Sequence, residues 1–505
     1  MNSFTRRALS LIGLTPLDSG RRQRRSYQAG KINRLNRDWS TMQTSARADV
    51  YRYLRPMRAR HRVLAKNSDH FKKFLSLMRN NVAGPFGMTL KFAGGTEAQN
   101  AEVLAAYKQW CHKEFASVSG RLNFTMILRR IMTIWARDGE CLIRKIYGKN
   151  KFDYSLKFYD VNWLDENYNE TRANGNRIIM SVEIDEDDRP VAYWLTPPPV
   201  DYALGMRPTI LQRTRVPAEE IFHLVLPDDE NVGDDSCTRG VPWGHTGSLS
   251  LFNLDRADEA NLYSMRAGAS KMGFFESEEG DEEEGDGSKD ESRPPLIDHF
   301  EPGTFWELPP GKKFTAFDPQ FPNQAHDPFA RYILRRASAG LDTSYHSLTG
   351  DLSDVNFSSI RFGVEQERIV YRALQEDLKE LFCRPNLVDL ITSMVLAGRL
   401  KTVRPRDLEN FLEPEYQGHR WPYFEPVKDI QADRLGIEAG LDTITDSLAE
   451  QGKDIREVFA KRKAELELAK EMGIPLAAGA GSLIPGSIDA QGDESKSTKM
   501  EPAKN

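Results

Sequence analysis

The sequence has few cysteines, and no spacing pattern connects them. The 505-residue chain contains four cysteines without a CxxC pair or a metal-type Cys/His spacing: Cys111, Cys141, Cys237 and Cys383. We therefore expect free, mostly buried thiols and neither a disulfide framework nor a zinc site. The histidines are scattered singly, as surface or core polar residues usually are. No metal and no other cofactor is predicted.

Long apolar runs are also missing. No stretch reaches the roughly 18 apolar residues that a membrane-spanning helix needs, which excludes such a helix and a membrane partner. The stretch from Ala8 to Pro16 follows two arginines and faintly resembles a signal peptide. Its apolar core is short and interrupted by Gly13, and an arginine cluster follows it. We therefore expect a protein that is made in the cytoplasm.

The usual signatures of enzymes are absent. The phosphate-binding GxxxxGK[ST] pattern does not occur, and neither do HExxH or GxSxG in a suitable context. Gly479-Ala480-Gly481 lies in a low-complexity tail and is not interpreted as a dinucleotide loop. Asp138 and Glu140 flank Gly139, and we interpret them as part of a turn and not as paired catalytic acids. No catalytic residue is predicted, and the chain is not expected to be an enzyme.

Charge is nearly balanced overall but unevenly distributed. The net charge is −5, yet residues 1–66 carry 16 Lys and Arg against 3 Asp and Glu. Residues 276–292 carry 10 acids against one lysine. Blocks of this kind repel themselves and are typical of solvated tails or loops, although such a run can also attract a partner of opposite charge. The candidate arm residues are Arg21, Arg22, Arg24 and Arg25. The candidate acidic residues are Glu278, Glu279, Asp281, Glu282, Glu283 and Glu284.

Hydrophobic periodicity predicts helices and strands along most of the chain. In the first half, helices are expected over residues 46–82, 97–115, 123–136 and 247–272, and strands over 88–92, 140–147, 154–159, 178–184, 191–195 and 221–226. Short proline-punctuated β pieces follow over residues 294–317. A helix starts near Asp327-Pro328, where proline suits the first turn.

The C-terminal half is predicted to be mainly helical. The helix that follows Arg361 is expected to run to Phe382, and Pro385 is expected to end it. A second helix is expected over residues 387–396. Further helices are predicted over Asp429–Ala439, Thr443–Glu450 and Asp454–Met472. From residue 476 onward Ala, Gly, Ser and Lys dominate, which predicts a disordered tail.

The segment from Gly340 to Leu381 predicts a helix, a short acidic loop and a long helix. Ser358 or Ser359 is expected to cap the second helix, and Arg361 is expected to pair with Glu365 one turn later. The loop contains no lysine or arginine. Its candidate residues are Thr349, Gly350, Asp351, Leu352, Ser353, Asp354, Val355, Asn356 and Phe357.

Three groups of residues resemble the lambda family of tailed-bacteriophage portal proteins. The loop segment Ser344–Leu348, Asp351–Asp354 and Phe357–Arg361 is similar to the tunnel-loop region of that family. The segment Trp135–Leu142 resembles its W-x-x-x-G-E/D-x-F/L junction between helix and strand. Arg239-Gly240-Val241-Pro242 resembles the R-G-x-P/S segment that leads into its first stem helix. Ala439–Thr443 and Arg456–Phe459 add weaker similarity.

The resemblance implies an α+β portal fold. The domain boundaries in this chain are placed from the predicted helices, strands and loops. These are a basic N-terminal arm (1–45), a wing of helices and mixed sheet (46–245), a first stem helix (246–272), a clip with the acidic loop (273–325), a second stem helix (326–347), a tunnel loop (348–358), a long wing helix and the rest of the wing (359–428), a helical crown (429–473) and a disordered tail (474–505).

The resemblance also implies a function and partners. It implies a ring of twelve identical subunits at one capsid vertex of the virion, assembled in the host cytoplasm. Double-stranded DNA would pass through the ring during packaging and ejection. The implied partners are the large terminase subunit, a head-completion or adaptor protein, and the capsid or scaffold protein. Phosphate contacts dominate DNA affinity, so an acidic loop would let the polymer slide.

One alternative comes from a different class of protein. A nucleic-acid-binding or head-processing enzyme could use the basic arm. The size of the native particle discriminates the two, since a ring favours a portal and a monomer or dimer favours the enzyme.

Overall fold

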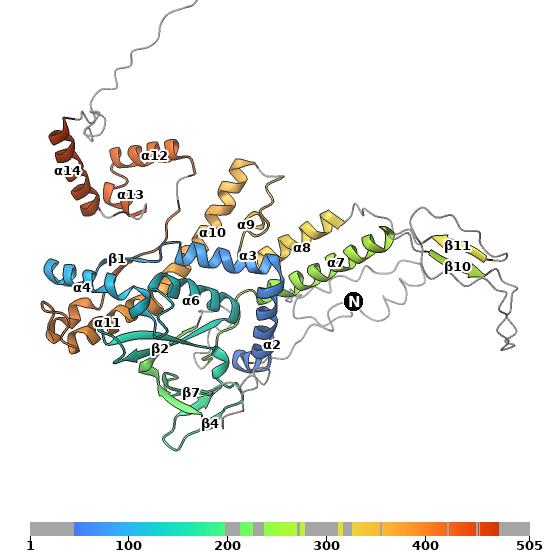
Figure 1. Cartoon of the computed structure of the whole chain (residues 1–505), viewed down its shortest axis with the longest axis horizontal. Helices are drawn as coiled ribbons and strands as arrows, with labels where there is room; N and C mark the ends of the chain where they lie inside the picture. Colours follow the sequence, from blue (N-terminus) through green and yellow to red (C-terminus); the bar gives the residue numbers. More distant parts are fainter. Residues whose placement is uncertain are drawn as a thin grey trace, which may run out of the picture.

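The fold is described from a computed structural model of the whole chain (Figure 1). The structure describes residues 45–196, 213–225, 237–269, 273–277, 312–316, 326–353, 356–421, 424–450, 453 and 455–473. The basic arm, nearly all of the acidic run and the C-terminal tail therefore lie outside the described residues.

The N-terminal helices form where apolar residues recur at helical spacing. In α2 (Ala46–Asn67) the buried residues follow each other every three or four positions, and the Ser45 side chain caps the first turn. The helix α3 (Asp69–Met78) continues into a π-helical turn, Arg79–Ala83. The next helices are α4 (Glu97–Trp110), α5 (Lys113–Ala116) and α6 (Phe124–Asp138). These confirm the expected helices.

Two antiparallel sheets follow. The order of the first is β3 (Tyr154–Tyr159), β2 (Glu140–Tyr147) and β9 (Ile221–Val225). The order of the second is β4 (Glu170–Thr171), β5 (Arg177–Ile179), β6 (Val182–Ile184), β7 (Pro190–Leu195) and β8 (Thr214–Pro217). Short 3₁₀ turns at Val161–Trp163 and Ala218–Glu220 connect them.

The single strand expected over residues 178–184 is wrong. Met180 and Ser181 adopt positive φ and reverse the chain, so β5 and β6 form a hairpin. Neither residue is a glycine or an asparagine, so the usual sequence signal for such a turn is absent.

Two long helices project from the sheets. The helix α7 (His245–Ala269) lies beside α8 (His326–Gly340), and the hairpin of β10 (Gly273–Ser277) and β11 (Lys312–Ala316) lies at their far end (Figure 1). The two helices approach closely at the start of α7 and the end of α8. A Cβ added to Gly247 would lie 2.9 Å from the carbonyl oxygen of Ala337. The second long helix was expected to reach residue 347, but it ends at Gly340.

The chain then forms α9 (Tyr345–Thr349) and the long α10 (Phe357–Leu378). The expected helix end at Pro385 is wrong. A π-helical turn, Lys379–Cys383, leads directly into α11 (Arg384–Leu396), where Pro385 lies in the first turn. Pro385 therefore lies within an unbroken helical run, and the π-helical turn before it changes the hydrogen-bond register where its N–H is missing.

The remaining described elements are a 3₁₀ segment, a short strand and three helices. A 3₁₀ segment, Pro405–Phe411, precedes β12 (Glu415–Gln417), which pairs with β1 (Thr89–Phe92). Then come α12 (Pro426–Glu438), α13 (Ile444–Glu450) and α14 (Ile455–Met472), on the side of the molecule away from the β10–β11 hairpin (Figure 1). Among the described helices, none is long and apolar enough to cross a membrane.

The main core connects segments from both halves of the chain. It contains Trp110 and Trp135 from the early helices together with Phe382 and Leu390 from the later ones. All four cysteines are free thiols, as expected; Cys141 and Cys383 are buried, and the other two are half-buried. Burial raises the pKa of the Cys111 thiol to about 12.

Candidate functional site

The predicted loop lies between α9 and α10 at one edge of the helical layer. It is shorter than expected, since Thr349 is the last residue of α9 and Phe357 the first of α10. Gly350 closes α9 with φ +75, a conformation that glycine adopts without strain. Leu352 and Ser353 are exposed, whereas Asp354 and Val355 fall outside the described residues.

Asp351 is held by its own segment. Its carboxylate accepts hydrogen bonds from the Tyr345 hydroxyl at 2.9 Å and from the Ser353 hydroxyl at 2.6 Å and amide at 3.0 Å. The Arg331 guanidinium on α8 lies 3.9 Å away. The hydrogen bonds from Ser353 and then Tyr345 hold the pKa of Asp351 below its ordinary value. This carboxylate therefore stays ionised, while its loop is bound to α8 and α9.

A buried carboxylate on α10 anchors the base of the loop. Glu367 accepts hydrogen bonds from the hydroxyls of Ser344 at 3.1 Å, Ser347 at 2.7 Å and Tyr371 at 2.5 Å. Ser344 also caps α9. The start of α9 is thus attached to the middle of α10, so the loop emerges between two helices whose relative position is set. The spacing of Ser344, Ser347 and Glu367 gave no local signal for this contact.

Two expected local contacts near the loop are wrong. The cap of α10 is Asn356, whose side chain accepts a hydrogen bond from the Ser359 amide at 2.8 Å. Arg361 pairs with Asp429 of α12 at 3.2 Å, and Glu365 pairs with Arg368 at 2.8 Å. A local sequence pattern cannot indicate Asp429, because it lies 68 residues further along the chain.

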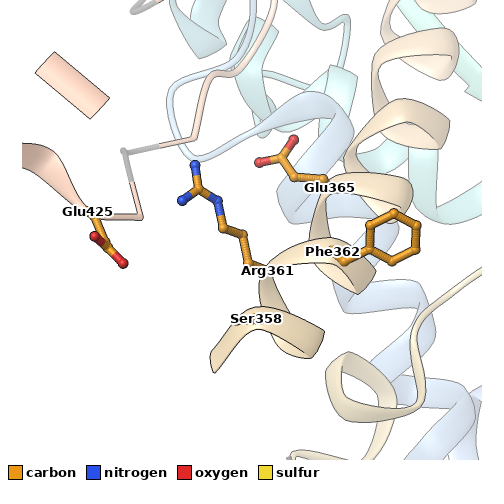
Figure 2. A pocket seen from close by; sticks show the side chains of 5 residues that line it. All are labelled: Ser358, Arg361, Phe362, Glu365 and Glu425. Atoms are coloured by element: carbon orange, nitrogen blue, oxygen red, sulfur yellow. The ribbon is translucent and has the colours of Figure 1, made fainter. Parts of the chain in front are cut away.

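A pocket of about 360 Å³ lies beside this Arg361–Asp429 pair. Figure 2 shows Arg361 between the carboxylates of Glu365 and Glu425, with the Phe362 ring pointing away from them. Among the described residues that line the pocket, Arg361 is the one cation, and it is already paired with Asp429. The pocket marks the junction of α10 with α12.

The second candidate site is a buried ion-pair cluster centred on Glu140. Both oxygens of this carboxylate accept from the Arg239 guanidinium, at 2.7 Å and 3.1 Å, and one accepts from Arg58 at 2.5 Å. His223 Nε2 lies 3.0 Å from Glu140 Oε2, the oxygen that does not contact Arg58. The Gly240 amide donates to the same oxygen at 3.1 Å. Glu140 and Arg239 are both fully buried.

The two buried arginines determine the protonation state of the Glu140 carboxylate. Burial alone raises the pKa of Glu140, but the guanidiniums of Arg239 and Arg58 more than offset it and hold this pKa well below its ordinary value. Arg58 also donates to the backbone oxygen of Asp138 at 2.9 Å, and the Asp138 carboxylate pairs with Arg62. The Glu140 carboxylate is therefore ionised and lies between the Arg58 and Arg239 guanidiniums.

Two glycines let the backbones meet around the cluster. Gly139 follows α6 with φ +81, and a Cβ there would lie 2.2 Å from the Val241 carbonyl carbon. A Cβ on Gly240 would lie 2.2 Å from the Gly139 carbonyl oxygen. Any larger residue at either position would separate the two segments.

The cluster joins the two motifs that were recognised separately in the sequence. The junction Trp135–Leu142 and the segment Arg239–Pro242 lie in contact, and His245, at the start of α7, follows directly. The turn interpretation of Asp138 and Glu140 is incomplete, because both carboxylates are buried in ion pairs. The missed signal was an acid beside a glycine in one motif (Glu140 and Gly139) and an arginine beside a glycine in the other (Arg239 and Gly240).

Other sequence-predicted residues are not described structurally. Arg21, Arg22, Arg24 and Arg25, and the acidic residues from Glu278 to Glu284, lie outside the described residues. Within the part of the chain that is described, no group of three or more His, Cys, Asp and Glu side chains is arranged to hold a metal ion.

The family model for "Phage portal protein, lambda family" matches residues 33–375. The chain is also 30% identical over 469 residues to the "Probable portal protein" of Halomonas phage phiHAP-1, a match that covers 89% of this chain and 88% of the relative. This chain therefore belongs to the lambda family of phage portal proteins.

Solved structures of gene transfer agent particles are more distant. "Neck of empty GTA particle computed with C6 symmetry" has a TM-score of 0.41 at 11% identity and covers 78% of this chain and 93% of that one. "Neck of native GTA particle computed with C12 symmetry" has a TM-score of 0.40 at 10% identity, with 80% and 93% covered.

Proposed function

We propose that this portal subunit forms a closed ring of twelve copies around a DNA channel at one capsid vertex. The ring nucleates procapsid assembly in the host cytoplasm, docks the large terminase during packaging and later binds head-completion proteins. Residues 46–245 and 359–428 form the wing, α7 and α8 the stem, residues 273–325 the clip, and residues 429–473 the crown.

The exposed apolar side chains of the proposed stem carry this proposal. In the single chain α7 leaves Leu249 66% exposed and Tyr263 60% exposed, and α8 leaves Tyr332 58% exposed. Leu251 and Leu254, on the other side of α7, are buried. Apolar side chains in such numbers on one pair of helices favour contact with further protein. Identical neighbours in a closed ring supply that contact for every copy.

The loop between α9 and α10 is proposed to line the narrowest part of the channel. It has no basic residue, and it is anchored at its base by Glu367. A ring would repeat Asp351 and Asp354 as circles of negative charge. Because phosphate contacts supply most of the sequence-independent affinity for DNA, such a lining weakens binding and favours sliding.

The size of the native particle tests the ring. We expect the full-length protein to form rings with about twelve times the 57.4 kDa mass of one chain, measured by native mass spectrometry and negative-stain microscopy. Removal of residues 1–25 should leave the ring intact, because the described wing helices begin at Ala46. A full-length protein that remains monomeric or dimeric would favour the enzyme alternative. Collapse of the truncated variant alone would show that the arm connects neighbouring subunits.

The acidic run from Glu276 to Glu291 is proposed to attract a basic partner at the clip, either terminase or an adaptor. Electrostatic attraction of this kind is screened beyond about 8 Å at physiological salt. Deletion of residues 278–286 should therefore weaken partner binding mainly at low ionic strength, as measured by surface plasmon resonance at several salt concentrations. If the parent and the deletion variant bind the partner with equal affinity at every salt concentration, the run is a solvated loop without this role.

A further inference from the structure

The helix α2 has two sets of basic residues that lie in opposite environments. Arg58 and Arg62 point inward and pair with Glu140 and Asp138. Arg52, Arg55, Arg60 and Lys66 are exposed, on the side opposite the buried residues Leu54, Arg58, His61 and Leu64. Within the part of the chain that the structure describes, none of these four forms an ion pair, and the Arg52 guanidinium lies 5.9 Å from the centre of the Tyr53 ring.

The four exposed cations are spaced along α2 and form a basic strip on its exposed side. From Arg52 to Lys66 the helix rises roughly 21 Å at about 1.5 Å per residue. At helical spacing Arg52, Arg55 and Lys66 lie within about 60° of one another, and Arg60 lies at the edge of the same face. The basic residues 1–44 end where α2 begins, so the arm and the strip are adjacent in the chain.

We infer that this strip binds the phosphate backbone of double-stranded DNA without sequence preference. Over about 21 Å, duplex DNA presents roughly twelve negative charges. The strip offers cations along the same length, and the large exposed hydrophobic residues between Arg52 and Lys66 are Tyr53 and Val63.

The size of the strip disfavours a protein partner. One exposed helix face about 21 Å long and about 10 Å wide covers roughly 200 Å². A stable protein–protein interface buries about 800 Å² on each partner. A polyanion needs only matched charges, because its affinity comes from counterion release. The surface therefore suits DNA better than an acidic protein.

The strip is separate from the proposed channel loop. The helix α3 contacts α2 and also contacts α9, so it lies between them (Figure 1). DNA on the strip would thus contact the portal outside the channel. This role does not depend on whether the ring forms, since each subunit carries its own strip.

A closed circular duplex is the appropriate probe, because it cannot thread through a ring. We compare the full-length protein with the R52Q/R55Q/R60Q variant by fluorescence anisotropy on a relaxed, labelled DNA minicircle of mixed sequence. The variant should bind at least about tenfold more weakly near 0.1 M salt, and its log–log salt slope should fall by roughly 2.7, about 0.9 for each lost phosphate contact. The matched control is R399Q/K401Q/R406Q, which removes three exposed charges elsewhere.

Circular dichroism and negative-stain particle size establish that both variants fold and assemble like the parent. Equal minicircle affinity of the parent and the strip variant would overturn the inference. So would equal weakening by the control variant, which would show a general charge effect. Binding of a polyglutamate peptide that depends on the strip, without minicircle binding, would instead assign the strip to an acidic protein. Failure of ring formation would overturn the proposed function and leave the minicircle result interpretable.

Discussion

The E140Q variant is expected to lower the free energy of unfolding by roughly 3–5 kcal/mol, the usual cost of breaking a buried ion pair from one side. Glutamine has nearly the shape of glutamate but cannot neutralise Arg58 and Arg239, and both guanidiniums are buried. Urea denaturation followed by circular dichroism measures the change. The matched control is E220Q, which breaks the partly exposed pair with Arg144 and should cost at most about 1 kcal/mol.

The same variant should alter the response to acid. The folded-state pKa of Glu140 is held below its ordinary value, so this residue stabilises the fold fully above the unfolded pKa of about 4.3. That contribution is lost as the pH falls from there through the folded pKa. The parent should therefore lose stability more steeply than E140Q below about pH 4. Equal unfolding midpoints for the parent and E140Q at neutral pH would show that the cluster does not stabilise the contact between β2 and the segment that precedes α7.

The D351K/D354K variant is expected to form rings and to package at least about tenfold less DNA. The two substitutions would replace acidic side chains that repel DNA phosphates with lysines that bind them, in every subunit of the ring. DNA content of purified particles, measured by quantitative PCR after nuclease treatment, gives the result. The matched control is E186K/D187K, the same charge change in the exposed turn before β7.

A second substitution separates charge from loop geometry. D351N removes the charge but retains an oxygen that can accept from Tyr345 or Ser353. If the loop acts by repelling phosphates, the amount of DNA packaged by D351N should lie between the amounts packaged by the parent and by D351K/D354K. Normal packaging by D351K/D354K would show that the loop does not face DNA.

Local patterns predicted most helices and strands within a few residues. The expected strand over 140–147 is β2, and the helices expected over 97–115 and 123–136 are α4 and α6. These elements depend on side-chain periodicity and on caps such as Asn123, which act within one or two turns. The helix through Pro385 and the hairpin at Met180 were missed, because a π-helical turn and positive φ at residues other than glycine have no strong local signal.

The sequence by itself determined the class of this protein, its order of elements and the motifs that carry the family resemblance. Each of these resides in residues close together in the chain. Only the tertiary structure brought Glu140 within hydrogen-bonding distance of Arg239, across 99 residues, and Asp351 close to Arg331. The reason is that a charged residue has many potential partners in the sequence, and packing of the core selects among them. The same packing turned Arg58 and Arg62 of α2 inward and left Arg52, Arg55 and Arg60 exposed.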